Sequence, residues 1–336
     1  MLTSGAPVEP LSVVETAVRG ETLHQAIMKA NLGLVTPPGD FSIEPLGDIH
    51  EYGMLALLKI GFNRTASEEK QPFARPHTFN NHGFQTHKPW TVMGAMGQYC
   101  FDNTAPLLAH TWDAAYWAAQ TAVSAAAFVA AGENQLAYAL CRPPGHHAGP
   151  DFYGGFCYLN NTAIAANWLV KQGQRIAILD LDYHHGNGTQ MVFYGRSDVL
   201  TLSLHADPFF EYPYFWGYAD EYGSGPGENY NFNYPLPRGA QEPAYVQALT
   251  HALDRIRRFV PDTLLVSLGL DTFENDPLGT FRLTTNSFYR IGQQLAAMKL
   301  PVVTIQEGGY DIPSLGDNVI AFFQGLSGLS RQQQED

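Results

Sequence analysis

From residue 107 onward, short apolar runs alternate with segments whose apolar residues recur at helical spacing. The runs "LAYALC", "RIAILDLD", "VLTLSLH", "TLLVSLGLD" and "PVVTIQEGG" are typical of strands. Helices are predicted at residues 107–131, 161–171, 243–259, 287–298 and 315–326. Near-continuously apolar strands separated by helices indicate a mostly parallel central sheet covered on both faces, which is a three-layer α/β/α architecture.

The pattern is weaker over residues 1–106. Residues 64–104 show neither a helical nor a strand period, so we expect a long insertion there. Its aromatic, histidine and methionine content favours an ordered contact surface over disorder. With no internal repeat and no low-complexity segment, we interpret residues 1–336 as a single α/β domain.

Composition narrows the classes of function. The chain has 19 basic and 32 acidic residues, which argues against binding nucleic acid or an anionic membrane and favours a cationic substrate. Cys100, Cys141 and Cys157 have no zinc-finger spacing and form no disulfide framework. The first twenty residues lack a basic segment followed by an apolar one, so we expect no secretory signal and a cytoplasmic location. The alanine-rich segment near residue 124 is interpreted as a core helix and not as a membrane span.

Polar side chains follow the run "ILDLDYHH". If the strand stays extended, Asp180, Asp182 and His184 lie on one side of it, two residues apart. Such a group forms either a metal site or a satisfied polar network, and burial of unpaired carboxylates is costly enough to favour the metal. Asp271 follows another apolar run; alone it is typical of a helix N-cap, but beside the first group it offers a third ligand. Two carboxylates and one imidazole would hold Zn²⁺ or Fe²⁺ with a coordination position open.

Two further elements add candidate chemistry. His146 and His147 follow a Pro-Pro-Gly corner after "LAYALC", and an imidazole there could transfer a proton. In "QEGGYD", Gly308 and Gly309 permit close backbone approach, so that Tyr310 could donate a hydrogen bond to an oxyanion. Each element has an ordinary alternative, surface polarity for the histidine pair and packing for the tyrosine.

Together these motifs identify a resemblance. The segments "RPPGHHA", "GGFCYLNN", "LDLDYHHGNGTQ", "LDTFENDP" and "EGGY" occur in the order found in the zinc-dependent histone deacetylase superfamily, which has the arginase/deacetylase fold. The sequence is most similar to the bacterial acetylpolyamine amidohydrolase branch. The resemblance implies one Zn²⁺ per chain, or Fe²⁺, bound by Asp182, His184 and Asp271. It implies that His147 is the general base and acid, that His146 is its electrostatic partner, and that Tyr310 polarises the amide carbonyl.

The resemblance also assigns residues around the metal. Asp180 and Asn187 match positions that orient the histidines, and Asn at the latter position is typical of class II-like and bacterial members. Phe156 and Tyr212 match the two aromatic walls of the acetyl channel, although many relatives have Phe at the latter position. Asp180 and Ser203, with backbone carbonyls near His184, match a structural K⁺ site.

Residues 64–104 resemble the segment that, in polyamine-specific members, forms a homodimer and narrows the active-site entrance. Relatives carry a glutamate just past the "YC" of this segment, where the nearest match here is Thr104, with Asp102 two residues earlier. The start of the chain lacks the family's usual first-strand and histidine pattern.

The resemblance predicts hydrolysis of N-acetylated amines, with acetylpolyamines as the first substrate class and acetyl-lysine in peptides as the alternative. Two other interpretations remain open. An arginase-like enzyme would bind two manganese ions, and a non-catalytic acetyl-group binder would keep the pocket without turnover.

Overall fold

The computed structural model describes residues 14–68, 70, 73–80, 87–132 and 135–328. Its centre is a six-stranded sheet with the order β1-β6-β5-β2-β3-β4, and every neighbouring pair is parallel. The strands are β1 (Leu136–Ala139), β2 (Ile176–Asp180), β3 (Val199–Ala206), β4 (Asn231–Leu236), β5 (Thr263–Leu268) and β6 (Val302–Gln306). All the strands therefore end on the same edge of the sheet, where ligands of parallel sheets bind.

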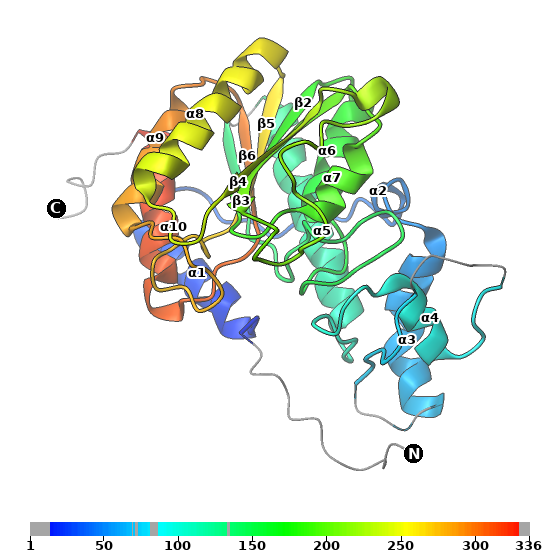
Figure 1. Ribbon diagram of the computed structural model, residues 1–336. Helices are drawn as coiled ribbons and strands as arrows, with labels where there is room; N and C mark the ends of the chain where they lie inside the picture. The colour runs from blue at the N-terminus through cyan, green and yellow to red at the C-terminus, as the bar shows by residue number, and fades with distance from the viewer. Residues whose placement is uncertain (1–13, 69, 71–72, 81–86, 133–134, 329–336) are drawn as a thin grey trace.

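Helices cover both faces of the sheet (Figure 1). One face carries α1 (Ala17–Ala30), α8 (Glu242–Phe259), α9 (Thr285–Ala296) and α10 (Ile312–Ser327), and the other carries α5 (Thr111–Ala130), α6 (Asn161–Lys171) and α7 (Asn187–Phe193). The remaining helices are α2 (Glu44–Gly47), α3 (Tyr52–Glu68), α4 (Val92–Tyr99) and the 3₁₀ turn η1 (Gly225–Gly227). The predicted three-layer α/β/α fold with a parallel sheet is confirmed.

Alternation along the strands divides the core between the two faces. In β2, Ile176 and Ile178 pack into the cluster under α5 and α6, whereas Ala177 and Leu179 pack into the cluster under α8, α9 and α10. All residues of β2, β3, β5 and β6 are buried. These strands are apolar on both faces because both faces are covered, which is why they were visible in the sequence.

β4 and α7 were not predicted, because their polar side chains form hydrogen bonds with one another inside the protein. β4 lies at the edge of the sheet, and its Asn231 accepts a hydrogen bond from Thr201 Oγ1 at 2.7 Å. Asn233 of β4 donates to Gln190 Oε1 at 2.9 Å, and Gln190 belongs to the equally unpredicted α7. Such pairing leaves no apolar period for sequence analysis to find.

The first third of the chain is more helical than expected. The interpretation of residues 64–104 as a stretch without helical period is wrong in part, because α3 ends at Glu68 and α4 spans Val92–Tyr99. Residues 69, 71–72 and 81–86 of this segment lie outside the described residues. Met96 of α4 is buried in the same core cluster as Leu58 of α3, and Thr91 caps α4 by accepting from Gly94 N. α1, α2 and α3 were likewise not predicted.

Sheet order decides which strand ends meet. β2 and β5 are neighbours at the centre, so the segments after them lie side by side, while β1 is at the far edge beside β6. None of the described helices is long and apolar enough to cross a membrane.

Candidate active site

The ends of β2 and β5 bring Asp182, His184 and Asp271 together. Their ligand atoms lie within 4.8 Å of one another. His184 Nδ1 is 3.3 Å from Asp182 Oδ1 and 3.1 Å from Asp271 Oδ2. The condition that the strand stays extended through His184 is not met, because β2 ends at Asp180. The turn that follows separates Asp180 from this group, and its carboxylate faces His146 instead.

Burial and mutual charge shift the pKa values of all three side chains. Burial raises the pKa of Asp271 to about 7, with a further contribution from the charge of Asp182. Burial also opposes ionisation of Asp182, but the positive charge of His146 and the hydrogen bond from His184 hold its pKa below the usual range. For His184, burial lowers the pKa, and the hydrogen bonds and charges of Asp182 and Asp271 outweigh it and raise the pKa to about 10. Two buried carboxylates facing one imidazole form a donor set that fits a divalent cation.

The backbone encloses the same carboxylates. Gly308 N donates to Asp182 Oδ2 at 2.8 Å, and Tyr183 N donates to Asp271 Oδ1 at 2.9 Å. A Cβ atom on Gly308 would lie 2.5 Å from Asp271 Oδ2 and 2.6 Å from Asp182 Oδ2. Only glycine lets the backbone approach both carboxylates, so the Gly-Gly turn shapes the site.

His146 and His147 reach the site on the long loop between β1 and α6. β1 does not adjoin β2, so this loop crosses the ends of β6 and β5 before it reaches the aspartates. His146 Nδ1 lies 3.0 Å from Asp180 Oδ2, and His147 Nδ1 lies 2.7 Å from Asn187 Oδ1. The two rings are 4.0 Å apart between centroids. Asp180 and Asn187 therefore each hold one histidine.

The two histidines differ in their preferred protonation state. Burial lowers the pKa of His146, but the charges of Asp182 and Asp180 outweigh it and raise the pKa to about 10. Burial and the neighbouring charges of His146 and His184 hold the pKa of His147 well below its usual range. Because His147 Nδ1–H donates to Asn187, its neutral form keeps the Nε2 lone pair available to accept a proton.

Tyr310 approaches from the turn after β6. It is buried, and its ring lies 5.8 Å from that of Phe156 between centroids. Burial raises the pKa of its phenol well above the usual range, so it remains a hydrogen-bond donor. Asp276 Oδ2 accepts from Tyr310 N at 2.6 Å and anchors the backbone of this turn.

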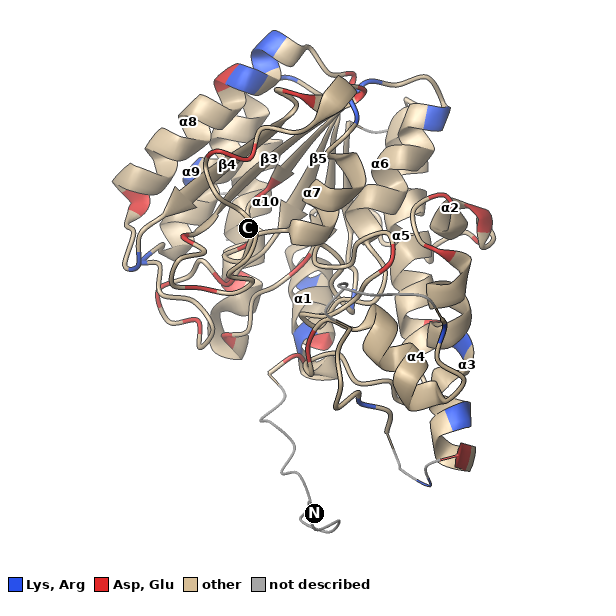
Figure 2. Cartoon of the chain, turned by 45° about the vertical axis from the view of Figure 1, so that its right-hand side comes forward, with Lys and Arg blue, Asp and Glu red and all other residues tan. Residues whose placement is uncertain are grey.

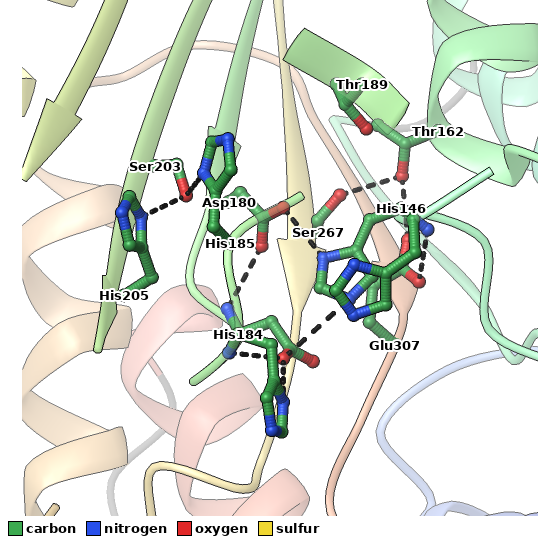
Figure 3. A network of polar contacts seen from close by, with 12 residues as sticks. His146, Thr162, Asp180, His184, His185, Thr189, Ser203, His205, Ser267 and Glu307 are labelled. Atoms are coloured by element: carbon green, nitrogen blue, oxygen red, sulfur yellow. Dashed lines mark hydrogen bonds and ion pairs between the residues drawn. The ribbon is translucent and has the colours of Figure 1, made fainter. Parts of the chain in front are cut away.

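Three supporting residues were not predicted. Arg19 of α1 donates to Gly309 O and Glu307 O, and its guanidinium carbon lies 4.5 Å from the centroid of the Tyr310 ring. Glu307, whose pKa burial raises to about 7, lies beneath His146 (Figure 3) and accepts from Gly145 N at 2.6 Å and His146 N at 3.1 Å. Asp276 is the third. The quoted motifs "EGGY" and "FENDP" contain the two acids, whereas nothing in the sequence around Arg19 signals its contacts.

The two predicted channel aromatics flank the histidines. The Tyr212 ring lies 5.0 Å from that of His147 and 6.1 Å from that of His184, edge to face. The Tyr212 hydroxyl donates to Asp102 Oδ2 at 2.7 Å. Phe156 and Tyr212 therefore border Tyr310 and the two histidines from different loops, and both are partly exposed.

The predicted potassium residues lie deeper in the sheet. Asp180 and Ser203 are partners in the β2–β3 register, and both line a small cavity of about 10 Å³. Ser203 Oγ lies 3.2 Å from His185 Nδ1 and 2.7 Å from His205 Nδ1. Figure 3 draws Ser203 between these two histidines.

Comparison with known proteins agrees with this geometry. The histone deacetylase domain family matches residues 13–326. Acetylpolyamine amidohydrolase 1 of Pseudomonas aeruginosa is 44% identical over 320 residues, covering 94% of this chain and 92% of the relative. The acetylpolyamine amidohydrolase of Mycoplana ramosa is 39% identical, with the same coverage. The crystal structure of an acetylpolyamine aminohydrolase from Burkholderia pseudomallei superposes with a TM-score of 0.89 at 42% identity, covering 94% of this chain and 91% of that chain.

The family match spans residues 13–326, and all the predicted site residues lie within that range. The fold, the grouping of acids and histidines at the strand ends and these matches lead to one conclusion. The chain belongs to the histone deacetylase domain family, in which it is similar along its length to the bacterial acetylpolyamine amidohydrolases.

Proposed function

We propose that this protein is a metal-dependent amidohydrolase that removes the acetyl group from acetylpolyamines and releases acetate and a free amine. One observation carries the proposal. A donor set of two aspartates and one histidine lies in the same site as a neutral His147 and the phenol of Tyr310. The full-length similarity to acetylpolyamine amidohydrolases supports the same conclusion.

Asp182, His184 and Asp271 would hold one Zn²⁺ or Fe²⁺, which when bound acts as a Lewis acid toward the acetyl carbonyl and the attacking water. His147 Nε2 takes the proton of that water and later delivers it to the leaving amine nitrogen. Tyr310 donates its phenolic hydrogen to the carbonyl oxygen as negative charge develops there. His146, held by Asp180, contributes positive charge beside His147.

A single catalytic metal is favoured over an arginase-like pair by the hydrogen bonds of Asp180. Its Oδ2 faces His146 and its Oδ1 accepts from Asp182 N at 3.1 Å. Asp180 is therefore not part of the group of ligand atoms formed by Asp182, His184 and Asp271, and it supplies no ligand for a second metal there. K⁺ at Asp180 and Ser203 would be a separate, structural ion, supported by their register and the small cavity between them.

The acidic balance of the chain supports a cationic substrate. Figure 2 shows Lys and Arg as scattered short segments, whereas Asp and Glu recur in the loops. A net charge of −13 attracts small polycations and repels nucleic acid. A cytoplasmic location is part of the same proposal.

Residues 64–104 are proposed to form a homodimer contact that narrows the entrance. Trp90 in this segment is 96% exposed, which is unusual for so large an apolar ring and favours a covered position in an assembly. Sedimentation of the wild-type protein and of Trp90→Ser tests this: a dimer that dissociates in the variant is expected, and a wild-type monomer would contradict it.

Acetate release tests the proposed activity. The metal-loaded enzyme is compared on N-acetylputrescine, N-acetylcadaverine, acetylspermidine and an acetyl-lysine peptide at equal concentration. We expect turnover of the small amines and little turnover of the peptide. A marked preference for the peptide would replace the polyamine assignment with the acetyl-lysine alternative, and binding without acetate release would support the non-catalytic binder.

A further inference from the structure

The two aromatic walls share one support, formed by Asp102 and Thr104 just after α4. Asp102 Oδ2 accepts from the Tyr212 hydroxyl at 2.7 Å and from Gly155 N at 3.0 Å. Asp102 Oδ1 accepts from Thr104 N and from Thr104 Oγ1, both at 2.9 Å. Thr104 Oγ1 in turn accepts from Phe156 N at 3.3 Å.

The backbone at Gly155 and Phe156 needs such support. Gly155 has φ +57° and Phe156 has φ +66°, and a phenylalanine in the left-handed region is strained. The amides of both residues are the ones that point at Asp102 and Thr104. A Cβ on Gly155 would lie 2.4 Å from His147 Cδ2 and 2.8 Å from the Tyr212 hydroxyl, so this backbone also touches both the base and the other wall.

The charge of Asp102 is satisfied within the protein. Four donors face its two oxygens: the Tyr212 hydroxyl, Gly155 N, Thr104 N and the Thr104 hydroxyl. No salt bridge joins Asp102 to a basic side chain among the residues that the structure describes. A carboxylate with this many donors holds structure and does not need a substrate ammonium group as its partner.

We propose that Asp102 and Thr104 form a bracket that fixes the distance between the Phe156 and Tyr212 walls, and that this bracket selects unbranched amines over amines branched beside the acetylated nitrogen. Asp102 and Thr104 are positioning residues, because they act through the two rings. The proposal rests on the proposed deacetylase function and assigns a specificity determinant to that site.

The test uses substrate pairs. The first pair is N-acetylputrescine and its analogue with a methyl group on the carbon that bears the acetylated nitrogen, and the measured quantity is the ratio of their kcat/KM values. Tyr212→Phe and Thr104→Val each remove one hydroxyl and keep the shape of the side chain. Since a hydrogen bond to a charged group is worth on the order of a tenfold change or more, we expect the ratio to fall about three- to tenfold in each variant.

Matched controls isolate the bracket. Tyr214→Phe makes the same change on the same loop at an exposed ring, and it should leave the ratio unchanged. Thr104→Ser keeps the hydroxyl and should restore the wild-type ratio. An unchanged ratio in both Tyr212→Phe and Thr104→Val would overturn the proposal.

A second pair separates the bracket from direct ammonium binding. N-acetylputrescine and neutral N-acetylbutylamine differ only in the terminal charge, so the bracket predicts that Asp102→Asn lowers kcat/KM for both by the same factor. A loss confined to the charged substrate would show that Asp102 contacts the ammonium group and would overturn the bracket.

Amide hydrogen exchange tests the bracket without catalysis. In Thr104→Val and Asp102→Ala, exchange at Gly155 and Phe156 should become about tenfold faster, because the acceptor of each amide is lost or displaced. Unchanged exchange would refute the bracket even in an active enzyme. Absence of acetate release by the wild-type protein, together with faster exchange in the variants, would refute the proposed function and leave the bracket standing.

Discussion

The acid and histidine floor and the aromatic wall of this site are built in different ways. We use "floor" for Asp182, His184, Asp271 and His147, and "wall" for Phe156 and Tyr212 with their bracket. Floor carboxylates follow central, fully buried strands, and their neighbours in the sheet fix their positions. Wall residues stand on partly exposed loops, one of them in a left-handed conformation, and hydrogen bonds from a distant segment hold them. The floor can therefore serve a shared chemistry, while the wall can change with the substrate.

The largest predicted effect is a loss of turnover when a floor residue is replaced. Replacing His147 with Ala removes the proposed acid–base group without touching the three predicted ligands, so kcat should fall by about 10²–10⁴ while the metal content per chain stays the same. Acetate release and elemental analysis of the same preparation measure the two quantities. A variant that keeps wild-type turnover would remove His147 from the proposed chemistry.

The stability of the protein is expected to depend on pH through His50, which anchors the loop that carries Phe156. His50 is fully buried, with Nδ1–H donating to Gly149 O at 2.8 Å and Nε2 accepting from Asn160 N at 2.9 Å, and burial lowers its pKa to about 4. The unfolded chain binds this proton near pH 6.5 and the folded protein only near pH 4. The contribution to stability is therefore complete above pH 6.5 and is lost as the pH falls toward 4, to a total on the order of 3 kcal/mol.

Urea unfolding at several pH values between 4 and 7 measures this dependence. His50→Gln keeps a donor and an acceptor but cannot titrate, so the slope of the free energy of unfolding against pH should be smaller in the variant. Parallel slopes for the two proteins would show that His50 is not the group that titrates.

An intermediate effect is expected from the backbone of the floor. In Gly308→Ala the new methyl group would overlap the Asp182 and Asp271 carboxylates, so metal affinity should fall about 10- to 100-fold. Gly195→Ala is the matched control, since a Cβ there meets nothing within 4 Å. Competition with a chelator gives the affinities, and equal values for the two variants would argue against the close approach at Gly308.

The smallest effect is expected from Glu307→Gln. Glu307→Gln keeps an oxygen for Gly145 N and His146 N, so kcat/KM should change by no more than about threefold, whereas Glu307→Ala strands both buried amides and should lose tenfold or more. A Gln variant as impaired as the Ala variant would mean that the charge of Glu307, and not its hydrogen bonds, supports the histidine loop.

The floor and most of the sheet could be predicted from the sequence because they depend on local patterns. Five apolar runs marked β1, β2, β3, β5 and β6, and the acids and histidines after them were correctly expected to meet. β4 and α7 were not predicted because their asparagine and glutamine side chains form hydrogen bonds with one another across the fold. α4 was not predicted because its segment has a weak apolar period. Its buried residues pack against α3, a contact that the sequence does not reveal.

The sequence by itself determined the parallel α/β/α architecture and the chemical character of the floor, because strand burial and charge burial impose strict local requirements on residue type. Only the tertiary structure decided that Arg19 lies over Tyr310 and that Asp102 and Thr104 hold both walls. Those contacts join residues that are far apart in the chain, and no local period of hydrophobic or polar positions encodes which distant loops will meet.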